Sequence, residues 1–218
     1  MGRVILVEAA IDSIDAAERA VREGALRLEV CGDLDVGGVT PSFELLRDCL
    51  DLDVPCVAMA RPRAGSFVYD DAEFAQLCAD ASNALAAGAH GVVFGCLRPD
   101  RTIDEDDVRA VVRVLENAET VFHRAFDETA DAADALDVLI DAGVTRVLTS
   151  GHAPTAMEGL DEIAAMVKRA RGRITILPGG TVRGSNVREL VAKTGVTQVH
   201  ARATDAGVIA EIRAALSA

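Results

Sequence analysis

The chain has 218 residues, half of them hydrophobic, which suffices for the core of one large domain or two small ones. A net charge of -13, with lysine only at positions 168 and 193, leaves no basic tract for a nucleic-acid backbone. No apolar run has the length of a membrane span, no signal peptide is recognisable, and the five cysteines include no C-x-x-C pair. We therefore expect a reduced, cytoplasmic protein that binds neither nucleic acid nor membrane.

One unit recurs along the chain: a short β-branched strand, a polar turn and a stretch with helical periodicity. Eight strands are predicted, at residues 4–8, 27–31, 56–61, 91–95, 120–125, 146–149, 174–177 and 198–202. Glycine precedes four of them, in EGALRLEV, AGAHGVVF, DAGVTRVL and KTGVTQVH, as expected of a helix C-cap. Eight such units without a linker favour a single (β/α)8 TIM barrel over residues 1–218, with an open, doubly wound sheet as the alternative.

Alternation along the strands predicts which side chains point into the barrel. In the second strand Arg27, Glu29 and Cys31 share the inward face, and the same parity places Glu8 and His200 inside. These polar residues are expected at the C-terminal ends of the strands, where TIM barrels carry their active sites. The N-terminal ends are expected to be mostly apolar.

Acids and imidazoles at these ends are the candidates for proton transfer. Glu8 and Glu29 end adjacent strands, so their carboxylates are expected close enough to share a proton, an arginine or a metal ion. A buried structural network with arginine is the alternative for both. His123, in the segment VFHRAFD, is expected to exchange protons near neutral pH, with Asp127 or a strand acid orienting its ring.

Fixed positive charges favour an anion in the same place. Arg61, Arg63 and Arg124 are expected at the C-terminal ends of the third and fifth strands, where they would bind a carboxylate or phosphate or, alternatively, neutralise buried acids. After the seventh strand, Gly179 and Gly180 in PGGTVRGSNV lie where many barrels hold a phosphate, although turn formation alone also explains them. His200 on the last strand is a further candidate for the anion site.

Cys31 is the candidate metal ligand, since a thiolate beside an imidazole suits Cu(I). No strand ends in lysine, which disfavours a Schiff-base aldolase, and nothing indicates an organic cofactor.

The segments VEAAIDS, LEVCGDLDVGGVTPS, ARPRAGSF, VFHRAFDET, RVLTSG, LPGGTV and QVH occur in this order over nearly the whole chain. Together they resemble the CutC copper-homeostasis family. The resemblance implies a TIM-type barrel, a cytoplasmic homo-oligomer, and an association with copper tolerance and Cu(I) binding. It places the family's pocket residues on Glu8, Glu29, Cys31, Arg61, Arg63, His123, Arg124, Asp127 and His200. The chain departs from the family at Ala9 and Ala10, where cysteine is common.

Two functional hypotheses follow. One is a copper-homeostasis protein that binds Cu(I) through Cys31. The other is a metal-independent enzyme, of isomerase or lyase type, acting on a small anionic or phosphorylated metabolite. In the second hypothesis the acids and His123 transfer protons, and the arginines and the glycine turn hold the anion.

Overall fold

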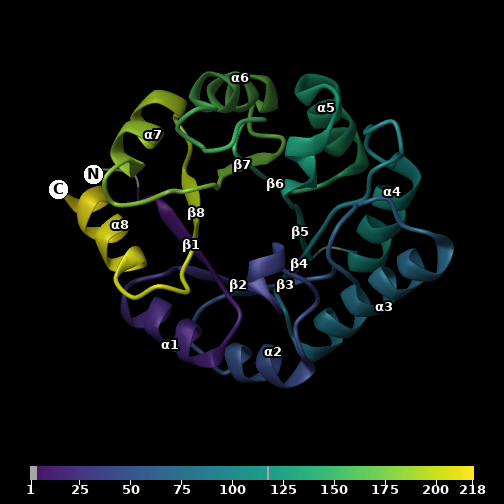
Figure 1. The fold of residues 1–218 in the computed structure, drawn as a ribbon, viewed down its shortest axis with the longest axis horizontal. Coiled ribbons are helices and arrows are strands. Elements are labelled where there is room, and N and C mark those ends of the chain that lie inside the picture. The colour runs from purple at the N-terminus through teal and green to yellow at the C-terminus, as the bar shows by residue number, and fades with distance from the viewer. Residues whose placement is uncertain (1–3, 117) are drawn as a thin grey trace.

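A nearly closed barrel of eight parallel strands, surrounded by eight helices, forms the fold in the computed structural model, which describes residues 4–116 and 118–218 (Figure 1). The strands are β1 (Leu6–Ile11), β2 (Arg27–Val30), β3 (Cys56–Met59), β4 (Gly91–Phe94), β5 (Glu119–Phe122), β6 (Arg146–Thr149), β7 (Thr175–Pro178) and β8 (Gln198–Arg202). The helices are α1 (Ile14–Arg22), α2 (Phe43–Leu50), α3 (Asp71–Ala87), α4 (Glu105–Leu115), α5 (Ala132–Ala142), α6 (Leu160–Ala170), α7 (Val187–Thr194) and α8 (Val208–Ser217). The predicted (β/α)8 barrel is confirmed, and the open sheet is excluded.

The strands follow one another in the order β7-β6-β5-β4-β3-β2-β1-β8, and β7 lies beside β8 where the barrel closes. In this register Glu8 of β1 lies opposite Arg27 on β2 and opposite His200 on β8. The first and last strands therefore bring residues 192 positions apart in the sequence into direct contact.

Outward-facing strand residues such as Leu28 and Val30 pack against the helices in a continuous apolar layer. Inside the barrel a smaller apolar cluster contains Cys31, Leu34 and Met59. Glycines end α3, α5 and α7 with positive φ, as the repeated turn segments predict.

Several strand boundaries differ from the prediction. The first strand begins and ends later than expected, because Ala9, Ala10 and Ile11 continue the ladder with β2. The fifth strand ends at Phe122, because His123 caps a 3-10 helix, η2 (Arg124–Glu128), by accepting a hydrogen bond from the Ala125 amide. Glu8 is therefore inside its strand and not at the C-terminal end.

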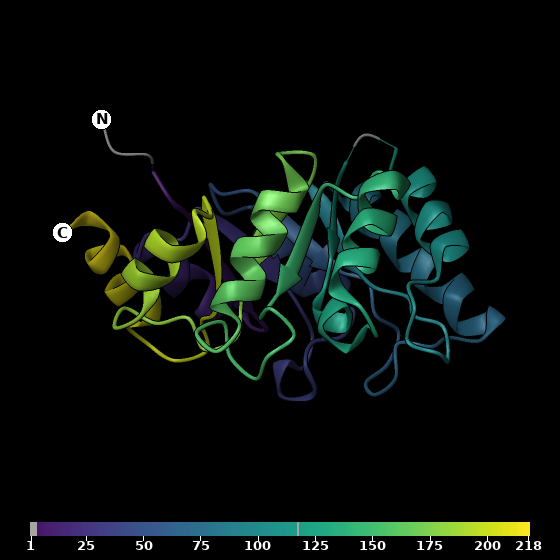
Figure 2. The same ribbon diagram turned by 90° about the horizontal axis from the view of Figure 1, so that it is seen from above.

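The longer loops gather at one end of the barrel, along the lower edge in Figure 2. This end holds η2 and a second 3-10 helix, η1 (Leu34–Val36), which lies over the barrel opening (Figure 1). The C-terminal ends of the strands are thus covered by loops that leave a pocket between them.

Candidate functional site

A pocket of about 790 Å³ opens at the C-terminal ends of the strands. Leu148 and Met59 give it an apolar floor, and Phe67 forms part of its wall. The charged and imidazole side chains of its lining are Glu29, Arg61, His123, Arg124, Asp127, Glu128, His152, Arg183, His200 and Arg202. The pocket lies at the end of the barrel where the sequence predicts the site.

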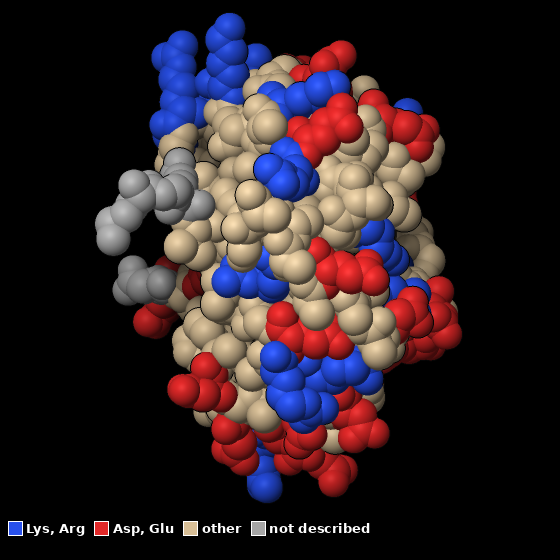
Figure 3. Space-filling model, turned by 90° about the vertical axis from the view of Figure 1, so that its left-hand side faces the viewer, with Lys and Arg blue, Asp and Glu red and all other residues tan. Residues whose placement is uncertain are grey.

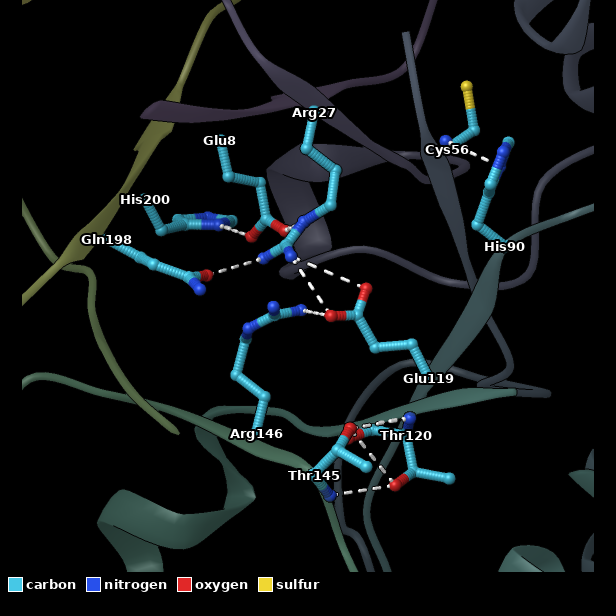
Figure 4. Close-up of polar contacts among 10 residues, drawn as sticks. All are labelled: Glu8, Arg27, Cys56, His90, Glu119, Thr120, Thr145, Arg146, Gln198 and His200. Atoms are coloured by element: carbon cyan, nitrogen blue, oxygen red, sulfur yellow. Dashed lines mark hydrogen bonds and ion pairs between the residues drawn. The ribbon is translucent and has the colours of Figure 1, made fainter. Parts of the chain in front are cut away.

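Beneath the pocket, an ionic network fills the N-terminal end of the barrel (Figure 4). The buried Arg27 donates to Glu8 at 2.5 Å, to Glu119 at 3.2 Å and to Gln198 at 3.4 Å. Arg146 pairs with the same Glu119 carboxylate. The expectation of an apolar N-terminal end is therefore wrong: the first residues of β2, β5, β6 and β8 are polar and meet inside the barrel.

Glu8 belongs to this network and does not line the pocket. Its carboxylate is fully buried and also accepts a hydrogen bond from His200 Nδ1 at 2.7 Å. Burial opposes ionisation, but Arg27 and His200 outweigh it and lower the pKa of Glu8 from 4.5 to about 2. Glu8 is therefore a permanent carboxylate in a structural ion pair, which corrects its prediction as a proton-transfer group.

Glu29 lies two residues beyond Arg27 on β2, nearer the C-terminal end of the barrel, and it lines the pocket. The Cys31 thiol donates to Oε1 at 3.3 Å, while the buried Oε2 atom has no hydrogen-bond partner among the described residues. Burial raises the pKa of Glu29 above its ordinary value, and the neighbouring Glu8 carboxylate adds to the rise. Glu29 thus has the free, basic oxygen that Glu8 lacks.

His200 joins the two acids. Its Nδ1 atom lies 3.8 Å from Glu29 Oε2, in addition to the bond to Glu8. Burial disfavours the imidazolium, but the two carboxylates outweigh burial and raise the pKa of His200. The two carboxylates therefore favour the protonated form of His200, whose Nδ1–H is bonded to Glu8.

His123 lines the pocket with a neutral ring. Burial and the Arg61 charge lower its pKa from 6.5 to about 3, which opposes the expected proton exchange near neutral pH. Its Nδ1 atom accepts a hydrogen bond from the Ala125 amide at 3.1 Å, which places the ring proton on Nε2. The buried Nε2 has no partner among the described residues, so a ligand acceptor is the group that would satisfy it.

Asp127 does not orient His123, contrary to expectation. Its carboxylate accepts hydrogen bonds from the Ser150 amide at 3.0 Å and from Thr149 Oγ1 at 2.5 Å, and it pairs with Arg124 at 2.8 Å. It thereby ties η2 to the loop after β6. Its role here is to hold the rim of the pocket.

The arginines divide into paired and unpaired groups. Arg124 pairs with Asp127, and Arg202 pairs with the exposed Asp35 at 2.6 Å. Arg61 is buried and donates to the backbone carbonyls of Val36, Gly38 and Gly65 at 2.8–3.2 Å, while its guanidinium lies over the Phe67 ring.

Among the described residues, Arg61 has no carboxylate partner within salt-bridge distance, and the same is true of Arg183 in the loop after β7. Arg63, by contrast, does not line the pocket: it pairs with Glu73 at 2.5 Å and braces the N-terminus of α3. Of these two predicted anion-binding residues, Arg61 therefore lines the pocket and Arg63 does not.

Two inward glycines make room for the imidazoles. A Cβ atom at Gly95 would lie 2.5 Å from His123 Cε1, and one at Gly179 would lie 3.2 Å from His200 Cδ2. Gly180, with φ of +94°, lines the pocket itself beside Thr181. The glycine turn thus shapes the pocket, as its position in the sequence indicates.

The structure brings together most of the predicted residues, and it adds some that sequence reasoning missed. Arg183 lies in the quoted PGGTVRGSNV segment, so its charge in a glycine-rich loop was an available signal. Strand parity could also have revealed Glu119, Arg146 and Gln198, which occupy inward positions at strand starts. Met59 lies on the inward face of the third strand by the same parity, and Phe67 ends the quoted segment ARPRAGSF, so both positions carried a signal.

One cluster of donor atoms inside the barrel could hold a metal ion. Glu8, Glu29 and His200 place three potential ligand atoms within 4.8 Å of one another. Carboxylates and imidazole do not match the soft ligands that Cu(I) prefers, and Glu8 is already paired with Arg27. Cys31 is soft but fully buried, and burial raises the pKa of its thiol well above 9. The residues present therefore do not fit Cu(I) at this cluster.

The distribution of charge on the visible surface does not indicate a further binding site. On the side where α7 and α8 lie, Figure 3 shows acidic and basic side chains intermixed, without a continuous basic tract on that face. Among the described residues, no helix combines the length and apolarity that a membrane crossing needs.

The model of the CutC family matches residues 5–205 of the chain. A family protein CutC from Treponema denticola is 45% identical over 199 residues, covering 90% of this chain and 80% of the relative. The copper homeostasis protein cutC homolog of Homo sapiens is 39% identical, covering 91% of this chain and 73% of the relative. The crystal structure of the copper homeostasis protein CutC from Streptococcus agalactiae superimposes with a TM-score of 0.87 at 30% identity, covering 92% of this chain and all of that one.

Proposed function

The chain belongs to the CutC family, and we propose that it acts as an enzyme that binds a small anionic metabolite in the pocket and transfers protons on it. The reaction class is an isomerisation or an elimination, which requires only acid and base groups. We place the protein in the cytoplasm as a homo-oligomer, in line with its unpaired cysteines and the family resemblance.

One observation carries this proposal: unpartnered polar atoms of opposite character line the same pocket. His123 Nε2 is a buried donor and Glu29 Oε2 is a buried acceptor, and neither has a partner among the described residues. A buried polar group without a hydrogen bond costs about 1–3 kcal/mol, so such atoms call for a partner, and in a pocket of this size a bound ligand can supply it. The buried Arg61, without a carboxylate partner among the described residues, supports an anionic ligand.

Calorimetric titration with 2-phosphoglycolate and orthophosphate tests the proposal, with Arg183→Gln as the variant and Arg188→Gln, on the exposed side of α7, as the control. We expect the Arg183 variant to bind at least about tenfold more weakly, as loss of one charge-assisted contact worth about 1.5–3 kcal/mol requires. The control is expected to bind as the wild type does. Equal affinities for all three proteins would contradict an anion site in this pocket.

Copper handling is the second candidate, because the human and streptococcal relatives carry names that refer to copper homeostasis. Two soft donors, Cys31 just after β2 and Met59 on β3, lie in the same interior cluster and could hold copper as cargo. Titration of the reduced protein with Cu(I) against Cys31→Ser tests this candidate. Loss of one equivalent of bound copper in the variant would support it, and unchanged stoichiometry and affinity would contradict it.

A further inference from the structure

We propose that the pocket removes a proton from a carbon atom next to a carbonyl group, with Glu29 as the base and the Nε2–H of His123 as the hydrogen-bond donor to the carbonyl oxygen. The substrate class is a small α-hydroxy carbonyl compound with a phosphate or carboxylate group. This inference rests on the proposed function, because it names the substrate class and the chemistry of the same site.

The surroundings of His123 fix both the tautomer and the orientation of its ring. The Ala125 amide occupies His123 Nδ1, and Gly95 leaves space that any Cβ would take from the imidazole. Phe67 packs against the other side of the ring, with the centroids 4.8 Å apart. His123 therefore presents Nε2–H in a fixed direction, and its pKa of about 3 keeps the ring from becoming a cation that would protonate the oxygen outright.

The base side is equally constrained. The Cys31 thiol holds Glu29 Oε1, so Oε2 is the oxygen left for a substrate proton. Glu29 is 3% exposed and lines the pocket, so this free oxygen is shielded from bulk solvent and open to a bound substrate. His200, whose Nδ1 atom lies 3.8 Å away, balances the negative charge of Glu29 while the pocket is empty.

Strand register sets the two groups at neighbouring heights. In a TIM barrel, inward residues of alternate strands form one layer, so Glu29 of β2, Leu148 of β6 and His200 of β8 belong together. His123 follows β5 and belongs to the next layer toward the opening, with Met59 of β3. A substrate that lies on Leu148 and Met59 therefore has Glu29 in the layer beneath it and His123 in the layer beside it.

The step balances without a co-reactant. Glu29 Oε2 takes the proton from the carbon, the electron pair of the C–H bond forms the C=C bond, and the carbonyl π pair moves onto oxygen. The resulting enediolate oxygen accepts the hydrogen bond from His123 Nε2, which retains its proton. The hydroxyl proton of the enediolate passes from its oxygen to the neighbouring enolate oxygen, and Glu29 returns the carbon-derived proton to the neighbouring carbon, so the hydroxy carbonyl compound leaves as its isomer.

The anionic group of the substrate has its own partners. Arg61 and Arg183 line the pocket and have no carboxylate partner among the described residues. Arg124 and Arg202 already pair with Asp127 and Asp35. In a protein with a net charge of -13, these two guanidiniums make the pocket selective for a substrate that carries its negative charge away from the reacting carbon.

Exchange of carbon-bound hydrogen with D2O, followed by NMR, tests the proposal on dihydroxyacetone phosphate, ribulose 5-phosphate and hydroxypyruvate. We expect the wild-type protein to catalyse exchange in at least one of these probes. Glu29→Gln is expected to lower the rate by at least about 100-fold, as loss of a general base requires, with affinity for the probe changed by less than about tenfold. Glu44→Gln, on the exposed surface of α2, is the matched control and is expected to exchange at the wild-type rate.

Binding without exchange in all three probes would overturn the enolisation chemistry and leave the anion site in place. Exchange that is equally fast in Glu29→Gln would overturn the role of Glu29. Absence of binding for every probe would overturn the proposed function together with this inference. His123→Phe provides the second readout, because it keeps an aromatic ring packed against Phe67 and removes the Nε2–H donor. We expect this variant to bind the probe and to lose catalysis of hydrogen exchange.

Discussion

Arg27→Met removes the cation at the centre of the network beneath the pocket. The Arg27 side chain is 3% exposed, and the carboxylate of Glu8, its partner at 2.5 Å, is fully buried. Removal of one partner from a buried ion pair typically costs about 3–5 kcal/mol, because the remaining charge stays in a medium of low polarity. We therefore expect the free energy of unfolding at pH 7 to fall by about 3–5 kcal/mol.

The pH dependence gives the second half of this prediction. The pKa of Glu8 is about 2 in the folded protein against 4.5 in the unfolded chain, so its ionised form stabilises the fold above pH 4.5. A difference of this size corresponds to about 3 kcal/mol, lost as the pH falls from 4.5 through 2. In Arg27→Met the largest opposing charge is gone, so the pKa of Glu8 in the folded protein lies closer to its unfolded value and acid removes less of this contribution.

Urea unfolding at pH 7 and at pH 4, 3 and 2.5 measures both effects. Arg169→Met is the control, because Arg169 and Asp137 form an exposed pair on the helices, and exposed pairs contribute about 0–1 kcal/mol. If Arg27→Met does not fold at pH 7, Arg27→Lys provides a milder comparison, because it keeps the positive charge and loses the guanidinium contacts to Glu119 and Gln198. A loss below 1 kcal/mol, or an acid profile identical to that of the wild type, would refute this account of the network.

Three further predictions concern the pocket itself. Gly95→Ala is expected to lower the free energy of unfolding by about 1–3 kcal/mol and to weaken ligand binding, since its Cβ would lie 2.5 Å from the His123 ring; denaturation and calorimetry measure both. Asp127→Asn is expected to cost about 2 kcal/mol through weaker bonds to Thr149 and Ser150, and wild-type stability would contradict the bracing role. In ¹⁵N NMR, the His123 ring is expected to stay neutral from pH 8 to about 5 while His200 titrates above pH 6.5; a His123 midpoint near 6.5 would contradict its burial.

The barrel was predictable because its signals are local and repeated. Strand alternation correctly placed Glu8, Glu29 and Cys31 inside, and the glycine turns marked where helices end. The predicted strand boundaries were less accurate, because the residue at which a strand ends depends on the conformation of the segment that follows it. At β5 the sequence alone does not show that His123 turns to cap η2, since this requires the amide of Ala125 to reach its ring.

The sequence predicted which residues lie at the site, but it did not predict the role of each one. Sequence cannot tell which of two inward glutamates meets Arg27, because that depends on the register between β1 and β2. The register pairs Glu8 with Arg27 and leaves Glu29 free for the pocket. Likewise, the pKa of His123 follows from complete burial beside Arg61, which no local pattern encodes.

A crystal structure of the reduced protein, soaked with 2-phosphoglycolate in the presence of Cu(I), tests the central claim most directly. The account predicts the anion in the pocket, with an oxygen within hydrogen-bond distance of His123 Nε2, the charged group against Arg61 or Arg183, and no copper on Cys31. Copper bound to Cys31 with the pocket free of the anion would contradict it and would make copper the ligand of this protein.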